Sequence, residues 1–163
     1  MIVLVADTSV LIDLERATLT RAALALPHDF VVPDALYQLE LEPYDGALLI
    51  AAGLRIEGLS DTEVSAAAMH RRQHNRLSIA DTLALALAEA RGWNLLAGDA
   101  LLREAATACG VACHGTLWVV DQIEAGGLME RPDLAHRLRQ LYQHPRCRLP
   151  RREVEARIKR LLE

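Results

Sequence analysis

Short apolar runs alternate with helix-forming stretches along nearly the whole chain, and this alternation limits the fold more than any other feature. The runs that predict strands are 2–6, 30–32, 54–59, 93–97 and 111–114. Stretches with helical periodicity or helix-capping residues separate them. Strands separated by helices usually pair in parallel, and a parallel sheet is buried on both faces. The sequence therefore predicts an α/β fold with a central, mostly parallel sheet covered by helices.

Capping residues mark several of the predicted helices. Ser60 and Glu63 have the spacing of a capping box, Ser78 is placed to cap the next helix, and Gly92 is placed to end it. Pro33 and Asp34 favour a helix start. The predicted helices cover residues 8–16, 18–26, 33–41, 47–53, 61–75, 79–91, 100–109, 117–124, 132–143 and 151–162.

The size and composition of the chain favour one domain without a membrane span. Its 163 residues suffice for a single core, which Ala, Leu and Val must fill because aromatic residues make up only 4%. No apolar run approaches the roughly 18 residues of a membrane helix. The first residues predict a strand rather than a signal peptide. Three cysteines, an odd number, argue against a disulfide framework, so we expect a cytoplasmic protein.

The net charge of −4 conceals an uneven distribution. Residues 131–163 contain ten basic and four acidic residues, so this segment carries about +6 and the remainder about −10. A basic segment beside an acidic body is compatible with a phosphate-binding surface near a metal site. It is equally compatible with a pair of solvent-exposed, arginine-rich helices. We expect residues 126–163 to form a helical extension packed on the same domain as residues 1–125.

Four acidic residues lie where predicted strands give way to loops or helices. Asp7 and Asp99 follow apolar runs, Asp81 lies in the first turn of a helix, and Glu40 lies within another helix. In a parallel sheet, ligands bind outside the carboxyl ends of the strands. Carboxylates that converge there repel one another, and a hard divalent cation relieves the repulsion. These positions therefore indicate Mg²⁺- or Mn²⁺-dependent phosphoryl chemistry.

Each acid also has an ordinary structural explanation. Asp7 and Asp99 could simply cap the helices that follow them, and Asp81 could compensate a helix dipole. Glu40 could be a surface residue of its helix. The placement of all four after successive core elements favours a shared site.

Three segments of the sequence resemble the PIN-domain family, which includes the ribonuclease toxins of VapBC-type toxin–antitoxin pairs. The segments are VADTSVLI (5–12), LSIADTLALA (77–86) and LLAGDALLR (95–103). Together, in this order and spacing, they are fairly specific, and they fall within residues 1–125. The resemblance implies a three-layer α/β/α sandwich and a metal-dependent endoribonuclease that cleaves single-stranded RNA. It also implies a toxin of a type II toxin–antitoxin pair.

The resemblance assigns roles to particular residues. Asp7, Asp81 and Asp99 match metal-binding acids, with Mg²⁺ or Mn²⁺ as cofactor. Glu40 is the best match to a fourth catalytic acid, and Glu42 is a rival on a different helix face. The hydroxyl near the first acid is matched by Thr8 or Ser9, both candidates for substrate binding. The expected partners are RNA and a protein antitoxin, with a homodimer as a further expectation.

Arg103 lies one turn beyond Asp99 and could hold either a substrate phosphate or a neighbouring carboxylate.

Other readings of the sequence are weaker. A haloacid-dehalogenase-type phosphatase needs an acid where Ser9 stands, and a response-regulator receiver needs a lysine other than Lys159. A DNA-directed flap-type nuclease is disfavoured because the chain has no long insertions. A protein of the same fold that binds RNA or a partner with little turnover remains the alternative.

The chain also has histidines and cysteines with loose metal-ligand spacing. His70 and His74 predict an exposed polar helix, while ordinary burial explains Cys109, Cys113 and His114.

Overall fold

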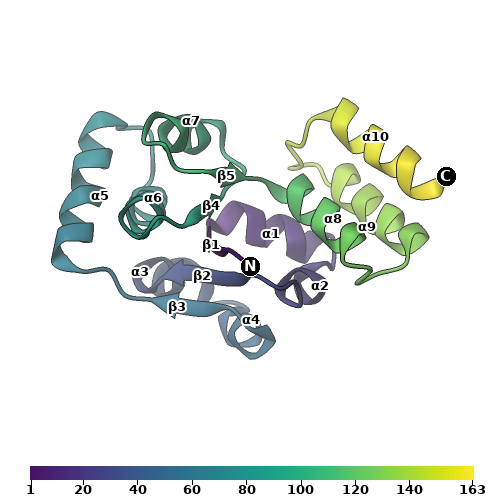
Figure 1. The fold of residues 1–163 in the computed structure, drawn as a ribbon, viewed down its shortest axis with the longest axis horizontal. Coiled ribbons are helices and arrows are strands. Elements are labelled where there is room, and N and C mark those ends of the chain that lie inside the picture. The colour runs from purple at the N-terminus through teal and green to yellow at the C-terminus, as the bar shows by residue number, and fades with distance from the viewer.

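The computed structural model describes residues 1–163 and contains one five-stranded sheet in which every pairing is parallel (Figure 1). The strand order is β3-β2-β1-β4-β5. The strands are β1 (Val3–Ala6), β2 (Asp29–Pro33), β3 (Arg55–Glu57), β4 (Asn94–Leu96) and β5 (Cys113–His114). All five lie within or overlap the predicted runs, and the predicted fold class is confirmed.

Ten α-helices and one π-helical segment connect and cover these strands. The three helices that begin after Pro33, Ser60 and Ser78 start where the capping residues predict. The helical elements are α1 (Thr8–Arg16), α2 (Thr20–Leu24), α3 (Asp34–Leu36), η1 (Tyr37–Leu41), α4 (Gly46–Ala52), α5 (Asp61–Gln73), α6 (Ile79–Arg91), α7 (Ala100–Ala108), α8 (Thr116–Ala125), α9 (Arg131–Gln143) and α10 (Arg151–Leu162).

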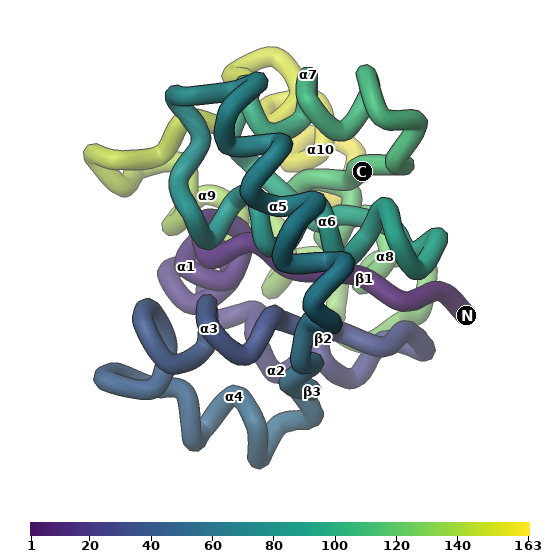
Figure 2. Tube along the Cα trace, turned by 90° about the vertical axis from the view of Figure 1, so that its left-hand side faces the viewer, coloured from purple at the N-terminus to yellow at the C-terminus, as the bar shows by residue number.

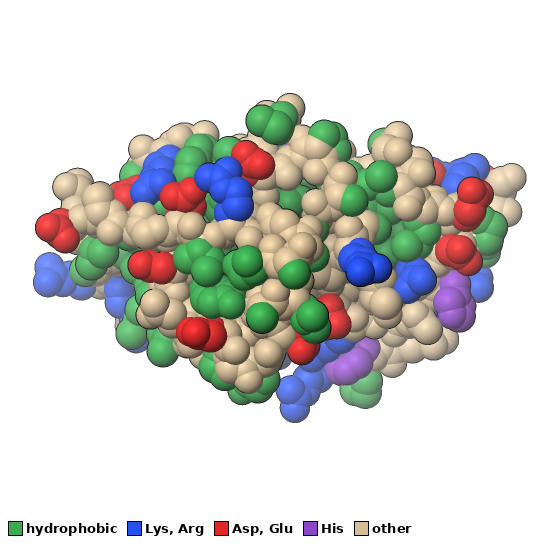
Figure 3. All heavy atoms as spheres, turned by 90° about the horizontal axis from the view of Figure 1, so that it is seen from below, with side chains coloured by type: hydrophobic (Ala, Val, Ile, Leu, Met, Phe, Trp, Pro, Cys, Tyr) green, Lys and Arg blue, Asp and Glu red, His purple; other side chains and the backbone are tan.

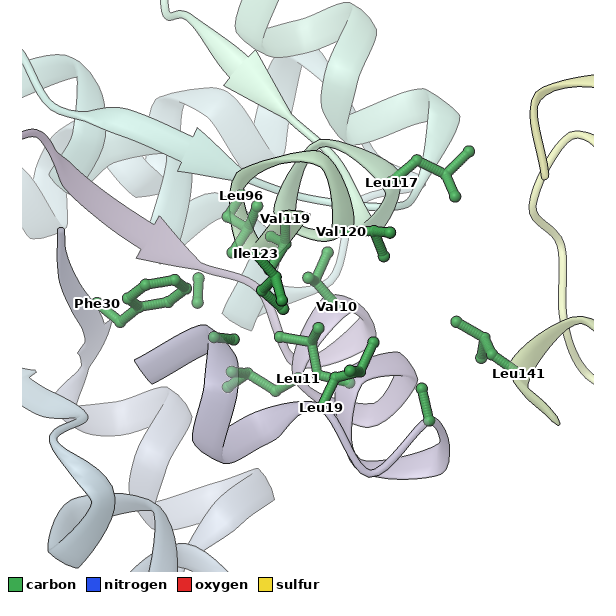
Figure 4. Packing of buried hydrophobic residues seen from close by; sticks show 14 of the residues in the cluster. Val10, Leu11, Leu19, Phe30, Leu96, Leu117, Val119, Val120, Ile123 and Leu141 are labelled. Carbon is green, nitrogen blue, oxygen red and sulfur yellow. The ribbon is translucent and has the colours of Figure 1, made fainter. Parts of the chain in front are cut away.

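The two faces of the sheet support separate hydrophobic layers. Leu4 and Ala6 of β1 belong to the larger cluster, with residues of α1, α2, α8, α9 and α10, whereas Val5 belongs to a second cluster with α6 and α7. This division follows from the two-residue period of a strand. Figure 4 shows residues of α8 packed over α1 in the larger layer, with Val119 and Ile123 close to Val10.

Helix α5 forms an outer layer over α6 (Figure 2). Arg91, at the end of α6, donates hydrogen bonds to Glu63 and to Glu57, and so ties α6 to α5 and β3. The Arg91 guanidinium lowers the pKa of Glu63 to about 2. The prediction of an exposed His70 was wrong, because α5 turns this face towards α6 and only 7% of His70 is exposed.

The two C-terminal helices pack on the larger hydrophobic layer. Leu134, Leu138 and Leu141 of α9 and Val154 of α10 are fully buried there. Arg157 and Arg160 of α10 form ion pairs with Asp121 of α8, so part of the basic segment is neutralised within the molecule. The boundary near residue 125 stays a prediction.

No helix in the structure is both long enough and apolar enough to cross a membrane.

Hydrophobic side chains gather near the middle of the face seen from below in Figure 3, with acidic side chains around them. The exposed apolar residues of α4 and β3 are Leu48, Ile50 and Ile56.

Candidate functional site

The four predicted carboxylates line one open surface pocket of about 550 Å³. The pocket lies at the edge of the sheet where the strands end, because Asp7 directly follows β1 and Asp99 follows β4. Strands β1 and β4 are neighbours and parallel, with Ala6 opposite Leu96. Helix α6 leads into β4, so its first turn, which carries Asp81, lies at this same edge. The residues lining the pocket are Asp7, Thr8, Ser9, Ile12, Leu39, Glu40, Tyr44, Asp81 and Asp99.

Asp7 is the buried member of the set, with 5% of its surface exposed. Its backbone N–H donates to the Leu96 carbonyl at 2.8 Å, which fixes the end of β1 against β4. The Ser9 hydroxyl donates to the Asp7 carboxylate at 2.7 Å. Ser9 Oγ also accepts from the Gly98 N–H at 3.3 Å. Ser9 therefore connects the loop before Asp99 to Asp7.

The capping explanation offered for Asp7 and Asp99 fails, whereas Asp81, for which dipole compensation was expected, takes part in a capping box. Asp7 and Asp99 occupy N-cap positions, yet neither side chain makes a capping hydrogen bond. Asp81 does: its carboxylate accepts from the Ser78 N–H at 2.9 Å, and the Ser78 hydroxyl accepts from the Asp81 N–H at 3.0 Å. The side chains of Asp7 and Asp99 are thus not committed to their own helices.

Glu40 reaches the pocket from the π-helical segment η1. The bond from the Glu42 N–H to the Tyr37 carbonyl, at 2.7 Å, spans five residues and widens the turn. Such turns are rare and often lie at functional sites. The Thr8 hydroxyl donates to the Glu40 carboxylate, so Glu40 is joined to the segment that carries Asp7. Glu42 is exposed and lies outside the pocket lining, which favours Glu40 as the fourth acid.

Burial, together with the negative charges of Asp81 and Glu40, raises the pKa of Asp7 to about 6. The hydrogen bond from Ser9 opposes this increase. A carboxylate that is buried beside other negative charges is unfavourable in its ionised form unless a cation lies next to it.

The pocket offers ligands of the type that a hard divalent cation prefers. It offers carboxylate and hydroxyl oxygens from β1–α1, η1, α6 and the start of α7, and no sulfur or imidazole ligand. Oxygen ligands of this type suit Mg²⁺ and Mn²⁺. The repulsion that raises the Asp7 pKa is also what a cation would relieve. Asp7, Asp81 and Asp99 as metal ligands, with Glu40 as a catalytic acid, stay predictions.

Arg103 is exposed and does not line the pocket. One nitrogen of its guanidinium would lie 3.7 Å from a Cβ added at Gly115, which places this side chain near β5. Its predicted role in substrate binding therefore has no contact with the pocket to support it.

Three pocket residues were not predicted from the sequence. Ile12, Leu39 and Tyr44 line the pocket beside the acids, and all three have exposed side chains. Leu39 and Tyr44 come from η1 and the turn after it. The sequence did offer one indication, because the apolar Leu39 lies next to the predicted catalytic acid Glu40. Helical spacing alone, however, did not show that this turn faces the pocket.

Comparisons with known proteins agree with this architecture. A family model described as PIN domain matches residues 3–163, so the match continues through α9 and α10, beyond the segment that carries the three motifs. Four solved chains match. One of them is a PilT N-terminus domain protein, SSO1118, from the hyperthermophilic archaeon Sulfolobus solfataricus P2. It is 14% identical with a TM-score of 0.52, and the match covers 74% of this chain and 92% of that chain. Among curated proteins, none matches this chain.

Proposed function

Because the chain belongs to the PIN-domain family, we propose that it is a divalent-metal-dependent endoribonuclease that cleaves single-stranded RNA. Membership of this family indicates nuclease-type chemistry. The observation that carries the proposal is the set of four carboxylates in one pocket, of which Asp7 and Asp99 make no capping hydrogen bond. Neither acid caps its helix, and the negative charges of Asp81 and Glu40 beside the buried Asp7 disfavour its ionised form unless a cation is bound.

The residues of the pocket have three proposed roles: some bind the metal, some orient the acids, and some contact the RNA. Asp7, Asp81 and Asp99 would hold Mg²⁺ or Mn²⁺, and Ser9 and Thr8 orient Asp7 and Glu40 through their hydroxyls. When bound, the cation supplies positive charge that offsets the phosphate and makes a water more acidic. Glu40, which lines the pocket, would accept a proton from a water there. The exposed apolar side chains of Leu39 and Tyr44 offer surfaces to the bases or sugars of an open strand.

We further propose that the protein is the toxin of a type II toxin–antitoxin pair, held inactive in the cytoplasm by a protein antitoxin. Exposed Leu39 and Tyr44 beside the pocket, with Leu48 on α4, would give such a partner apolar surface next to the acids it must cover. Co-expression with the product of a neighbouring small reading frame tests this part. Growth arrest by the chain alone, relieved by that product, is the expected result.

The nuclease proposal is tested with metal-free protein and a labelled single-stranded RNA. Millimolar Mn²⁺ or Mg²⁺ should start internal cleavage and also raise the melting temperature, since the cation binds only the folded chain. Asp7→Asn and Asp99→Asn should lower cleavage by roughly 100-fold or more while the protein stays folded. A single-stranded DNA of the same sequence shows whether the substrate class is RNA.

Glu40→Gln and Glu42→Gln form a matched pair for this experiment. The two residues are separated by one position, but only Glu40 lines the pocket. Glu40→Gln should lose cleavage, and Glu42→Gln should keep it. Cleavage that persists in EDTA, or in both aspartate variants, would reject the proposal. The alternative, a PIN-fold protein that binds RNA with little turnover, predicts metal-dependent RNA binding without cleavage in the wild-type chain.

A further inference from the structure

An imidazole, a carboxylate and a thiol meet away from the acidic pocket. His70 of α5, Glu89 of α6 and Cys109, which follows α7, each offer one ligand atom, and these atoms lie within 4.8 Å of one another. His70 Nε2 and a Glu89 carboxylate oxygen are 2.6 Å apart. Helices α6 and α7 lead into β4 and β5, so their ends lie at the amino edge of the sheet. The acidic pocket lies at the opposite edge.

The backbone around these residues favours positive charge. His70 and Glu89 lie in the last turns of α5 and α6, and Cys109 is the C-cap residue of α7. A helix C-terminus carries a partial negative charge and stabilises cations within its last turn. The partial negative charges of these three helix C-termini therefore add to the negative charge of Glu89.

One ring nitrogen of His70 has no partner, whereas the other is hydrogen-bonded to Glu89. His70 is buried, and its Nδ1 is the one buried side-chain nitrogen or oxygen in the structure that has no hydrogen-bond partner. A buried polar atom of this type is uncommon in a folded protein. Burial and the charge of Glu89 raise the pKa of the Cys109 thiol, so without a cation the thiol keeps its proton.

We propose that His70, Glu89 and Cys109 form a second metal site, which takes a transition metal of the Zn²⁺ class. One imidazole, one carboxylate and one thiolate are ligand types that Zn²⁺ accepts, and three protein ligands leave a position for water. The pocket at the other edge offers only oxygen ligands, so the two sites differ in the metals that they prefer. Binding at the second site joins the ends of α5, α6 and α7 and releases the thiol proton.

Cobalt(II) is a suitable probe because it substitutes for Zn²⁺ and its thiolate complexes absorb in the near ultraviolet. Metal-free full-length protein titrated with Co²⁺ should develop a thiolate charge-transfer band that reaches its limit at one equivalent, and Zn²⁺ should remove it. Cys109→Ser should abolish the band and weaken Zn²⁺ binding by roughly 100-fold or more. Glu89→Gln, which changes an exposed side chain, should weaken binding without unfolding the chain.

Two controls separate this site from other thiols and from the proposed nuclease site. Cys113→Ser removes a half-buried thiol on β5 and should keep the band. Asp7→Asn changes the acidic pocket and should also keep the band, so the second site can be tested whether or not the chain cleaves RNA. A wild-type chain that gives no band, or a band that survives Cys109→Ser, would overturn the proposal.

Discussion

At the scale of single residues, two features of the fold shift the pKa of Asp7 in the same direction. Its position after β1 and its bond to β4 bury it, while its place beside Asp81 and Glu40 surrounds it with negative charge. Both effects raise its pKa, to about 6, from 3.8 for an ordinary aspartate. The folded chain therefore binds a proton at Asp7 more readily than the unfolded chain does. The stability contributed by this proton is present below about pH 4 and is lost as the pH rises through 6.

Asp7→Asn should consequently stabilise the metal-free protein at neutral pH. Asparagine can still accept the hydrogen bond from Ser9 but cannot ionise. In EDTA at pH 7 we expect the variant to gain free energy of unfolding, up to the order of 3 kcal/mol. At pH 4 the gain should largely vanish, because Asp7 is then protonated in the folded wild type. Urea unfolding of both proteins at the two pH values measures this, and a variant that is less stable at pH 7 contradicts it.

Several site residues were predictable because their signals are local. An acid directly after a buried apolar run, as at Asp7 and Asp99, lies at the carboxyl edge of a parallel sheet whatever the order of the strands. The exposed Tyr44 and the buried His70 were not predictable in this way. Their environments depend on where η1 and α6 lie in space, which no local spacing encodes.

At the scale of secondary structure, η1 decides which glutamate faces the pocket. The sequence predicted a continuous helix to Leu41, and the segment is helical, but its last turn is widened to the π form. Gly46 packs so closely on this turn that an added Cβ would lie 2.8 Å from the Leu41 carbonyl oxygen and 2.9 Å from the Tyr37 ring. Caps, by contrast, are short-range, and the boxes at Ser60 and Ser78 form.

Gly46→Ala should therefore disturb the pocket from outside it. The clash involves backbone as well as a ring, so we expect a loss of stability of about 1–3 kcal/mol and a displaced Glu40. Cleavage and metal-induced stabilisation should both fall. Gly58→Ala is the matched control, because a Cβ there would meet only an ordinary contact at 3.7 Å. Urea unfolding and cleavage assays on both variants test this prediction. Equal stability and equal cleavage in the two variants would show that η1 tolerates the change.

At the scale of the whole molecule, the basic C-terminal segment has two parts. Arg157 and Arg160 are paired with acids of α8, and Arg151 is paired with Glu155. Arg146, Arg148 and Arg152 are exposed and form no ion pair. The net charge of the segment, read from the sequence, therefore overstates what remains available for a phosphate backbone. Sequence counts give total charge, but only the packing of α10 on α8 shows which arginines are already occupied.

Replacing Arg146, Arg148 and Arg152 together with alanine should weaken RNA binding and reduce its salt dependence. Three lost phosphate contacts on a single strand correspond to a slope of log K against log salt that is smaller by about 2. Stability should change little, because exposed charges contribute little to folding. Exposed Arg71 and Arg72 on α5, both replaced with alanine, are the control. An unchanged slope with an altered sedimentation mass would instead assign these arginines to a protein interface.

The central position of β1 has a consequence for the order in which the chain is made. Asp7 is synthesised before Asp99, which follows it by 92 residues, and β1 pairs with β4. At translation rates of about 5–20 residues per second, roughly 5 to 20 seconds separate the two carboxylates. The pocket cannot assemble on a nascent chain that lacks β4. If this protein cleaves RNA, it therefore stays inactive towards its own messenger until β4 and Asp99 have been made.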